Sequence, residues 1–138
     1  MKILITGASG FLGRYLIKNL LDYDFKISAL HKTSKNTNKF DSKIKLINKR
    51  IEEIDLKDLE DIETIIHLAS IGVSPKKASM SELEKINVAC SNKLIKLALK
   101  AGVRRFVAAG SCLEYGEEAN KWEYIPAYAS LRPMCNYS

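Results

Sequence analysis

The 138-residue sequence contains few cysteines and prolines and no long hydrophobic segment. Its three cysteines, Cys90, Cys112 and Cys135, are an odd number without the paired spacing of a disulfide framework or of a zinc site. We therefore expect a reduced, cytoplasmic protein without a metal site. No apolar run approaches the roughly 20 residues that a membrane-spanning helix needs, so we expect no membrane partner. The apolar stretch at 1–7 is too short for the core of a signal peptide.

Positive charge exceeds negative charge, but only in one stretch of the chain. There are 22 Lys and Arg against 16 Asp and Glu, a formal net charge of +6. Residues 31–50 hold seven of those cations and a single acid, Asp41, so the rest of the chain is neutral. A basic stretch without interleaved aromatic residues is weak evidence for nucleic acid, and we expect no such partner. The stretch is either a solvated loop or a site for an extra phosphate.

Short apolar runs alternate with helical patterns along the chain. Such runs are typical of parallel strands buried on both faces, and they predict strands at 2–6, 26–30, 44–47, 64–68 and 104–109. Between them the patterns predict a helix at 11–20 and a longer one at about 81–100, which ends before Gly102. This order predicts an α/β fold, a three-layer Rossmann domain with a doubly wound parallel sheet, over residues 1–138.

The two predicted helices carry apolar residues at spacings of three and four. In the first, Phe11, Leu12 and Tyr15 are expected to face the sheet together with Leu16 and Leu20. In the second, Ile86, Cys90, Leu94, Leu97 and Ala98 form the expected ridge. Three further apolar residues would widen that ridge, namely Val88, Ile95 and Leu99.

Three glycines stand between the first predicted strand and the first predicted helix, in the segment 6–13 (TGASGFLG). Gly7 allows a tight turn, Gly10 lets backbone N–H groups approach a pyrophosphate, and Gly13 lets the helix pack closely on the sheet. The free amides and the positive end of the helix dipole then face the phosphates. We therefore predict dinucleotide contacts from Gly7, Ser9, Gly10, Phe11, Leu12 and Gly13. The alternative is a generic loop that happens to contain three glycines.

The end of the second predicted strand bears on the choice of cofactor. An acid there would bind the ribose hydroxyls and favour NAD. The sequence instead continues with His31 and Lys32, without a carboxylate. A cation at that place suits a 2′-phosphate, so we expect His31 and Lys32 to contact the cofactor and prefer NADP over NAD. The alternative is that both are surface residues and that ribose selection is loose.

Four segments carry recognisable motifs, namely residues 6–13 (TGASGFLG), 66–70 (IHLAS), 87–92 (NVACSN) and 102–116. In the right order, they resemble the motifs TGxxGxxG, IHLAA, NVxGTxN and GVKRFVYxSS…VYG of the extended short-chain dehydrogenases/reductases. The members of that family are NAD(P)-dependent sugar-nucleotide epimerases, dehydratases and ketoreductases. The likeness spans essentially the whole chain. It implies that Leu68, Ala69 and Ser70 border the cofactor on its ribose side.

The resemblance also implies two catalytic residues. Ser111 matches the serine or threonine that binds a substrate oxygen, and Tyr137 matches the tyrosine of YxxxK that acts as general acid/base. The lysine of that motif would fall three residues beyond Ser138. Asn87 is interpreted as a structural residue at a helix start, and His67 as a strand-end histidine with satisfied hydrogen bonds.

The chain departs from the family pattern at two places. Residues 49–51 (KRI) stand where an acid often reads the adenine amino group, which puts that contact in doubt. Gly110 stands where a serine is frequent, and we expect this change to be tolerated.

The resemblance implies that the chain is the N-terminal portion of such an enzyme, without the family's C-terminal substrate domain. The full-length form would move hydride to or from a carbon of a nucleotide-sugar partner. The alternative is a truncated protein that binds a dinucleotide without turnover. An incomplete domain should leave apolar surface exposed, so we also expect self-association, for instance as a homodimer.

Overall fold

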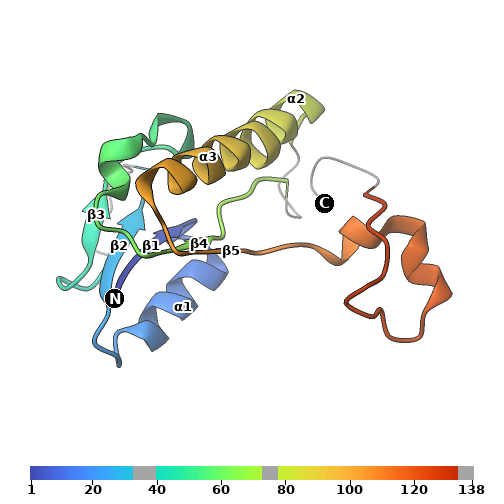
Figure 1. Ribbon diagram of the computed structural model, residues 1–138, viewed down its shortest axis with the longest axis horizontal. Coiled ribbons are helices and arrows are strands. Elements are labelled where there is room, and N and C mark those ends of the chain that lie inside the picture. Colours follow the sequence, from blue (N-terminus) through green and yellow to red (C-terminus); the bar gives the residue numbers. More distant parts are fainter. Residues whose placement is uncertain (33–39, 73–77, 134–138) are drawn as a thin grey trace.

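The computed structural model describes residues 1–32, 40–72 and 78–133. In these residues a five-stranded, wholly parallel sheet lies at the centre (Figure 1). Its strands are β1 (Lys2–Thr6), β2 (Lys26–Leu30), β3 (Lys45–Ile47), β4 (Thr64–His67) and β5 (Arg105–Ala108), in the order β3-β2-β1-β4-β5. The chain thus adds β2 and β3 on one side of β1 and then crosses back to add β4 and β5 on the other side. Ligands of open α/β sheets bind at the carboxyl ends of the strands where this reversal occurs, here between β1 and β4.

Helices cover both faces of the sheet, as expected for three layers (Figure 1). Helix α1 (Phe11–Leu20) connects β1 to β2 on one face. The other face carries a continuous helix built from α2 (Met80–Leu83), the π-helical segment η3 (Glu84–Cys90) and α3 (Ser91–Ala101). Two short 3₁₀ helices, η1 (Ile51–Glu53) and η2 (Leu56–Leu59), lie on that same face between β3 and β4. The predicted α/β architecture is therefore confirmed.

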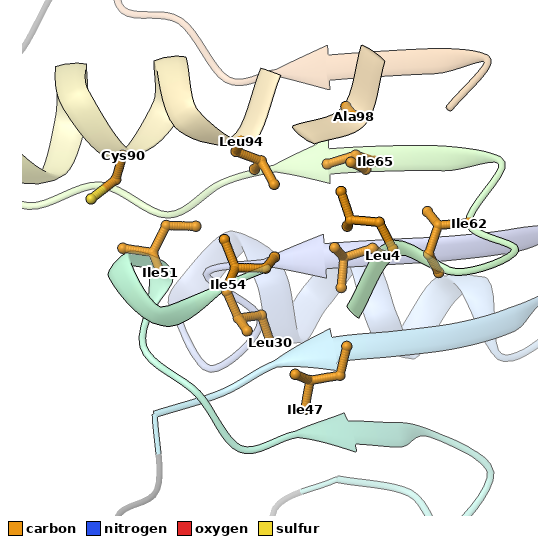
Figure 2. Packing of buried hydrophobic residues seen from close by; sticks show 11 residues of the cluster. Leu4, Leu30, Ile47, Ile51, Ile54, Ile62, Ile65, Cys90, Leu94 and Ala98 are labelled. Atoms are coloured by element: carbon orange, nitrogen blue, oxygen red, sulfur yellow. The ribbon is translucent and has the colours of Figure 1, made fainter. Parts of the chain in front are cut away.

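The core is divided by the sheet into two apolar clusters. On β1, Leu4 packs toward α3, among Ile65, Leu94 and Ala98 (Figure 2). Its neighbours Ile3 and Ile5 pack with the cluster of α1 on the opposite face. Successive residues of a strand point to opposite sides, so β1 contributes to both clusters. This explains why the strand is an unbroken apolar run.

Element boundaries differ from the predictions by one or two residues. Strand β3 begins one residue later than expected, β4 ends one residue earlier, and β5 is shorter by one residue at each end. The long helix begins at Met80 because Ser79 caps it, the Ser79 hydroxyl accepting a hydrogen bond from the Glu82 amide at 3.2 Å. It ends before Gly102, which has the left-handed φ of 73° that favours glycine.

The predicted apolar faces of the helices were partly wrong. On α1 it is Gly13 and Ile17 that are buried against the sheet, whereas Phe11 is 81% exposed and Leu12 and Tyr15 are exposed as well. Apolar spacing alone does not say which side of the stripe meets the sheet. In this helix the close approach at Gly13 decides it. The residues expected to widen the ridge of the second helix, Val88, Ile95 and Leu99, are likewise exposed.

The segment after β5 leaves the sheet edge (orange to red in Figure 1). It forms the 3₁₀ segment η4 (Cys112–Lys121), which is interrupted at Gly116 by a backbone φ of 51°. Ser111 caps this segment, since its Oγ accepts a hydrogen bond from the Leu113 amide at 3.2 Å.

Candidate functional site

The glycine turn lies where the sequence analysis placed it, between β1 and α1. Gly7 has a left-handed φ of 66°, and the Gly10 amide donates to the Gly7 carbonyl at 2.9 Å. Gly10 is the N-cap residue of α1, no side chain caps the helix, and no acid lies in its first turn. The first amides of a helix lack intrahelical acceptors, so this end of α1 is open to an anionic ligand.

The three glycines are required for different physical reasons. A Cβ on Gly7 would lie 2.6 Å from the carbonyl carbon of Leu68, so the turn packs directly on the segment after β4. A Cβ on Gly13 would lie 2.4 Å from the carbonyl oxygen of Gly7, so the helix also packs directly on the turn. A Cβ on Gly10 would meet only the Gly7 oxygen, at 3.1 Å. Gly10 therefore presents bare backbone to open space, as a pyrophosphate site needs.

Two hollows meet at this turn, and Gly7 and Gly10 line both of them. The first, of about 620 Å³, we call the basic hollow, because the cations Lys32, Lys49, Arg50 and Lys85 outnumber the acids Glu52 and Glu82 in its wall. Lys49 is neutralised by ion pairs to Asp55 and Asp58, at 3.1 and 2.8 Å, and these raise its pKa. In the described part of the chain, Lys32, Arg50 and Lys85 make no ion pair.

The second hollow, of about 740 Å³, we call the Ser111 hollow. It lies between the glycine turn, the end of β5 and the helix that includes α3. Its wall includes Gly10, His67, Asn87, Gly110, Ser111 and Glu114. Of its described lining residues only Glu114 is an acid, and none is a lysine or arginine.

Most residues that the sequence predicts for the site line one hollow or the other. The basic hollow includes Ser9, Lys32, Leu68, Ala69 and Ser70, and the Ser111 hollow includes Phe11, Leu12, Gly13 and Ser111. His31 lines neither hollow: it is buried, its ring meets the edge of Phe40 at 5.3 Å, and neither ring nitrogen has a partner in the described residues. Tyr137 lies outside the described residues.

Sequence reasoning did not select several of the charged residues in the walls. Arg50 was noted only as a departure from the family pattern, while Glu52, Glu82, Lys85 and Glu114 were not considered. They come from different segments, and only the sheet order brings those segments to one place. A search for charged residues just beyond predicted strand ends would have found Arg50 and Glu114.

A buried chain of hydrogen bonds lies directly beneath the turn. His67, which is 7% exposed, pairs through Nδ1 with Thr6 Oγ1 at 2.6 Å and through Nε2 with Ser91 Oγ at 2.8 Å. The Ala69 amide donates to the same Thr6 oxygen at 3.2 Å. Burial lowers the pKa of His67, which favours the neutral ring. The prediction that His67 is a satisfied strand-end histidine is confirmed.

The segment after β4 is held from the helix side as well. Asn87 accepts a hydrogen bond from the Ile71 amide at 3.0 Å and donates one to the Ile71 carbonyl at 3.1 Å. Asn87 lies inside η3, rather than at a helix start as predicted, but its contacts are structural as expected. Since residues 68–71 line the basic hollow, these bonds fix one of its walls.

A parallel sheet whose first strand leads through an open glycine turn into a helix, with hollows at the strand ends, defines a Rossmann-like domain. The comparisons with known proteins agree with this class. Residues 3–138 match the NAD-dependent epimerase/dehydratase family, and the chain belongs to that family.

Individual relatives are similar only over part of their length. CDP-abequose synthase of Salmonella muenchen is 26% identical over 138 residues, which cover 95% of this chain and 44% of the relative. UDP-glucose 4-epimerase of Haemophilus influenzae is 29% identical over 132 residues, 85% of this chain and 38% of the relative. Of the solved structures, MoeE5 in complex with UDP-glucuronic acid and NAD is 28% identical, with a TM-score of 0.82, over 99% of this chain and 44% of that one. The chain thus spans less than half the length of these relatives.

Two further observations concern the described residues alone. None of their helices combines the length and apolar character that a membrane span requires. Nor do they contain a cluster of three or more His, Cys, Asp and Glu side chains able to hold a metal ion.

Proposed function

We propose that residues 1–138 form the cofactor-binding portion of an NAD-dependent enzyme that acts on a nucleotide-activated sugar. The observation that carries this proposal is the position of Gly10, whose bare backbone lies at the open end of α1 and lines both hollows. A dinucleotide with its pyrophosphate at this turn would extend into one hollow on each side. The adenosine end would belong in the basic hollow, because Rossmann-type sheets bind the adenosine ribose near the end of the second strand, and Lys32 lies there in this chain.

The nicotinamide end then belongs in the Ser111 hollow. When bound there, the nicotinamide supplies hydride transfer to or from a sugar carbon. Ser111 Oγ accepts a hydrogen bond from the Leu113 amide, so its own hydroxyl hydrogen is left to donate to a substrate oxygen. Ser111 would thus orient the substrate carbonyl or alcohol. Tyr137 is proposed as the general acid/base on the strength of its match to the family motif alone.

The basic hollow supports a finer proposal about the adenosine ribose. Lys32, Arg50 and Lys85 line it without ion pairs in the described residues, and no acid follows β2 directly. These charges favour a 2′-phosphate, whereas MoeE5 was solved with NAD. We propose that NADP binds at least as tightly as NAD. Titration with NADH and NADPH tests this: Lys32→Ala should weaken NADPH more than NADH, and equal losses would contradict it.

The test of the main proposal is calorimetric titration of the chain with NAD. Gly10→Val places a branched side chain where both hollows meet, and we expect NAD binding to fall at least tenfold while the fold is retained. Gly102→Asn is the matched control, because a Cβ there meets nothing within 4 Å and asparagine tolerates a positive φ. Undiminished binding by Gly10→Val, or no binding by the unmodified chain, would contradict the proposal.

A further inference from the structure

Ser111 and Glu114 are locked into one turn of helix at the end of β5. The Glu114 amide donates to the Ser111 carbonyl at 3.0 Å, which closes a 3₁₀ turn. Both residues line the Ser111 hollow. The carboxylate of Glu114 is therefore on the same side of the turn as the serine hydroxyl.

The Glu114 carboxylate lies close to the backbone of Gly110. A Cβ on Gly110 would lie 2.9 Å from Oε2 of Glu114 and 3.4 Å from Oε1. The carboxylate thus occupies the space that a larger residue at 110 would take. In the described part of the chain the Glu114 side chain makes no ion pair or hydrogen bond. Its charge is available to whatever occupies the hollow.

The two hollows consequently differ in the sign of the charge that their walls carry. The basic hollow has three cations without ion pairs, whereas Glu114 contributes the sole formal charge among the described residues of the Ser111 hollow. His67 adds none at neutral pH, because burial lowers its pKa. A nicotinamide ring carries a positive charge when oxidised and loses it on accepting hydride. A carboxylate in the same hollow therefore stabilises the oxidised ring more than the reduced ring.

We propose that Glu114 gives this site a preference for the oxidised cofactor by placing a negative charge in the hollow that receives the nicotinamide. This inference rests on the proposed NAD site. It deepens that proposal by assigning to Glu114 a selectivity between the oxidised and the reduced cofactor. The matches of Ser111 and Tyr137 to the family motifs do not supply this selectivity. An enzyme with this preference holds NAD ready to take hydride from an alcohol of its substrate.

The experiment compares the dissociation constants of NAD and NADH, measured by calorimetry, for the unmodified chain and for Glu114→Gln. Glutamine keeps the shape and removes the charge, so we expect NAD to bind about three- to tenfold more weakly and NADH to change little. A tenfold change in the ratio corresponds to about 30 mV in the reduction potential of the bound two-electron couple. The effect should shrink as salt is raised.

Two controls separate this effect from general damage. Glu117→Gln removes an equal charge from the same 3₁₀ segment, but Glu117 is exposed and lines a different hollow, with Lys121 and Arg132. It should leave the ratio unchanged. ADP-ribose lacks the nicotinamide, so its affinity should be the same for the unmodified chain and Glu114→Gln.

Gly110→Ser provides a second variant that keeps the charge but displaces it. The new Cβ would push the carboxylate away, and the NAD/NADH ratio should move toward that of Glu114→Gln. If Glu114→Gln binds both forms with an unaltered ratio, the inference is overturned and the NAD site stands. If the unmodified chain binds neither form, both proposals fall.

Discussion

The side-chain amide of Asn87 makes two hydrogen bonds to the backbone of Ile71, 16 residues earlier in the chain. Asn87 lies in the π-helical segment η3, and Ile71 lies in the wall of the basic hollow. Segments of π-helix occur often at functional sites. Here η3 places the side-chain amide of Asn87 where it hydrogen-bonds both the backbone N–H and the carbonyl of Ile71, which lies in an otherwise irregular stretch. The helix thereby fixes this wall of the basic hollow.

Replacing Asn87 should therefore damage both stability and binding. Asn87→Asp keeps an acceptor for the Ile71 amide but faces the Ile71 carbonyl without a donor, and we expect a loss of about 1–3 kcal/mol in the free energy of unfolding. NAD affinity should fall as well, since residues 68–71 would no longer be held. Urea denaturation and calorimetry measure the two effects. Asn92→Asp, an exposed change in the same helix, is the control; equal stability of the two variants would contradict the assignment.

The burial of His67 predicts a dependence of stability on pH. Burial places the pKa of His67 in the folded state below its ordinary value of about 6.5, so the unfolded chain binds a proton first as the pH falls. The free energy of unfolding should therefore be constant above about pH 7 and should decrease with acidification from there to the folded pKa. Carboxylates with lowered pKa values, such as Asp55 and Glu118, add their own losses only at lower pH.

His67→Gln isolates this contribution, because glutamine lacks the titrating group. Chemical denaturation at several values between pH 5 and pH 8 should show the decrease in the unmodified chain and a flatter profile in the variant. The stability advantage of histidine over glutamine should be largest at neutral pH and smaller in acid. Parallel profiles would show that His67 is not the group responsible.

The glycine turn offers a prediction in which packing and binding can be separated. In Gly13→Ala the new methyl group would meet the Gly7 carbonyl oxygen, a backbone atom that cannot move without shifting the turn. We expect a loss of about 1–3 kcal/mol, as for an overpacked core. Gly10→Ala has only a 3.1 Å contact and should lose little stability but bind NAD more weakly. Thermal unfolding and titration of both variants check this, and similar stability of the two would contradict it.

Much of the fold could be predicted from the sequence because local rules decide it. Buried parallel strands must be apolar on both faces, and the turn from Thr6 to Gly13 packs as it does only with glycine at positions 7 and 13. The side of α1 that meets the sheet could not be predicted, because Phe11, Leu12 and Tyr15 follow the same spacing as the residues that are buried. The two hollows could not be predicted either. Their charges come from Lys32, Arg50, Lys85 and Glu114, which only the sheet order brings around one turn.

The exposed apolar residues of the second helix predict self-association. Ile95 and Leu99 are one turn apart on α3, and Leu99 is 76% exposed, while Ile95 also lines the Ser111 hollow. Strand β5 is the edge strand of the described sheet, and unpaired sheet edges also favour association between chains. Apolar surface of this kind favours contact between copies of the chain.

We expect light scattering to show a molar mass that rises with concentration. The double variant Ile95→Gln with Leu99→Gln should keep the chain monomeric. Leu56→Gln removes a half-exposed leucine from η2 and is the matched control. A double variant that associates as strongly as the control would show that this helix face is not the contact.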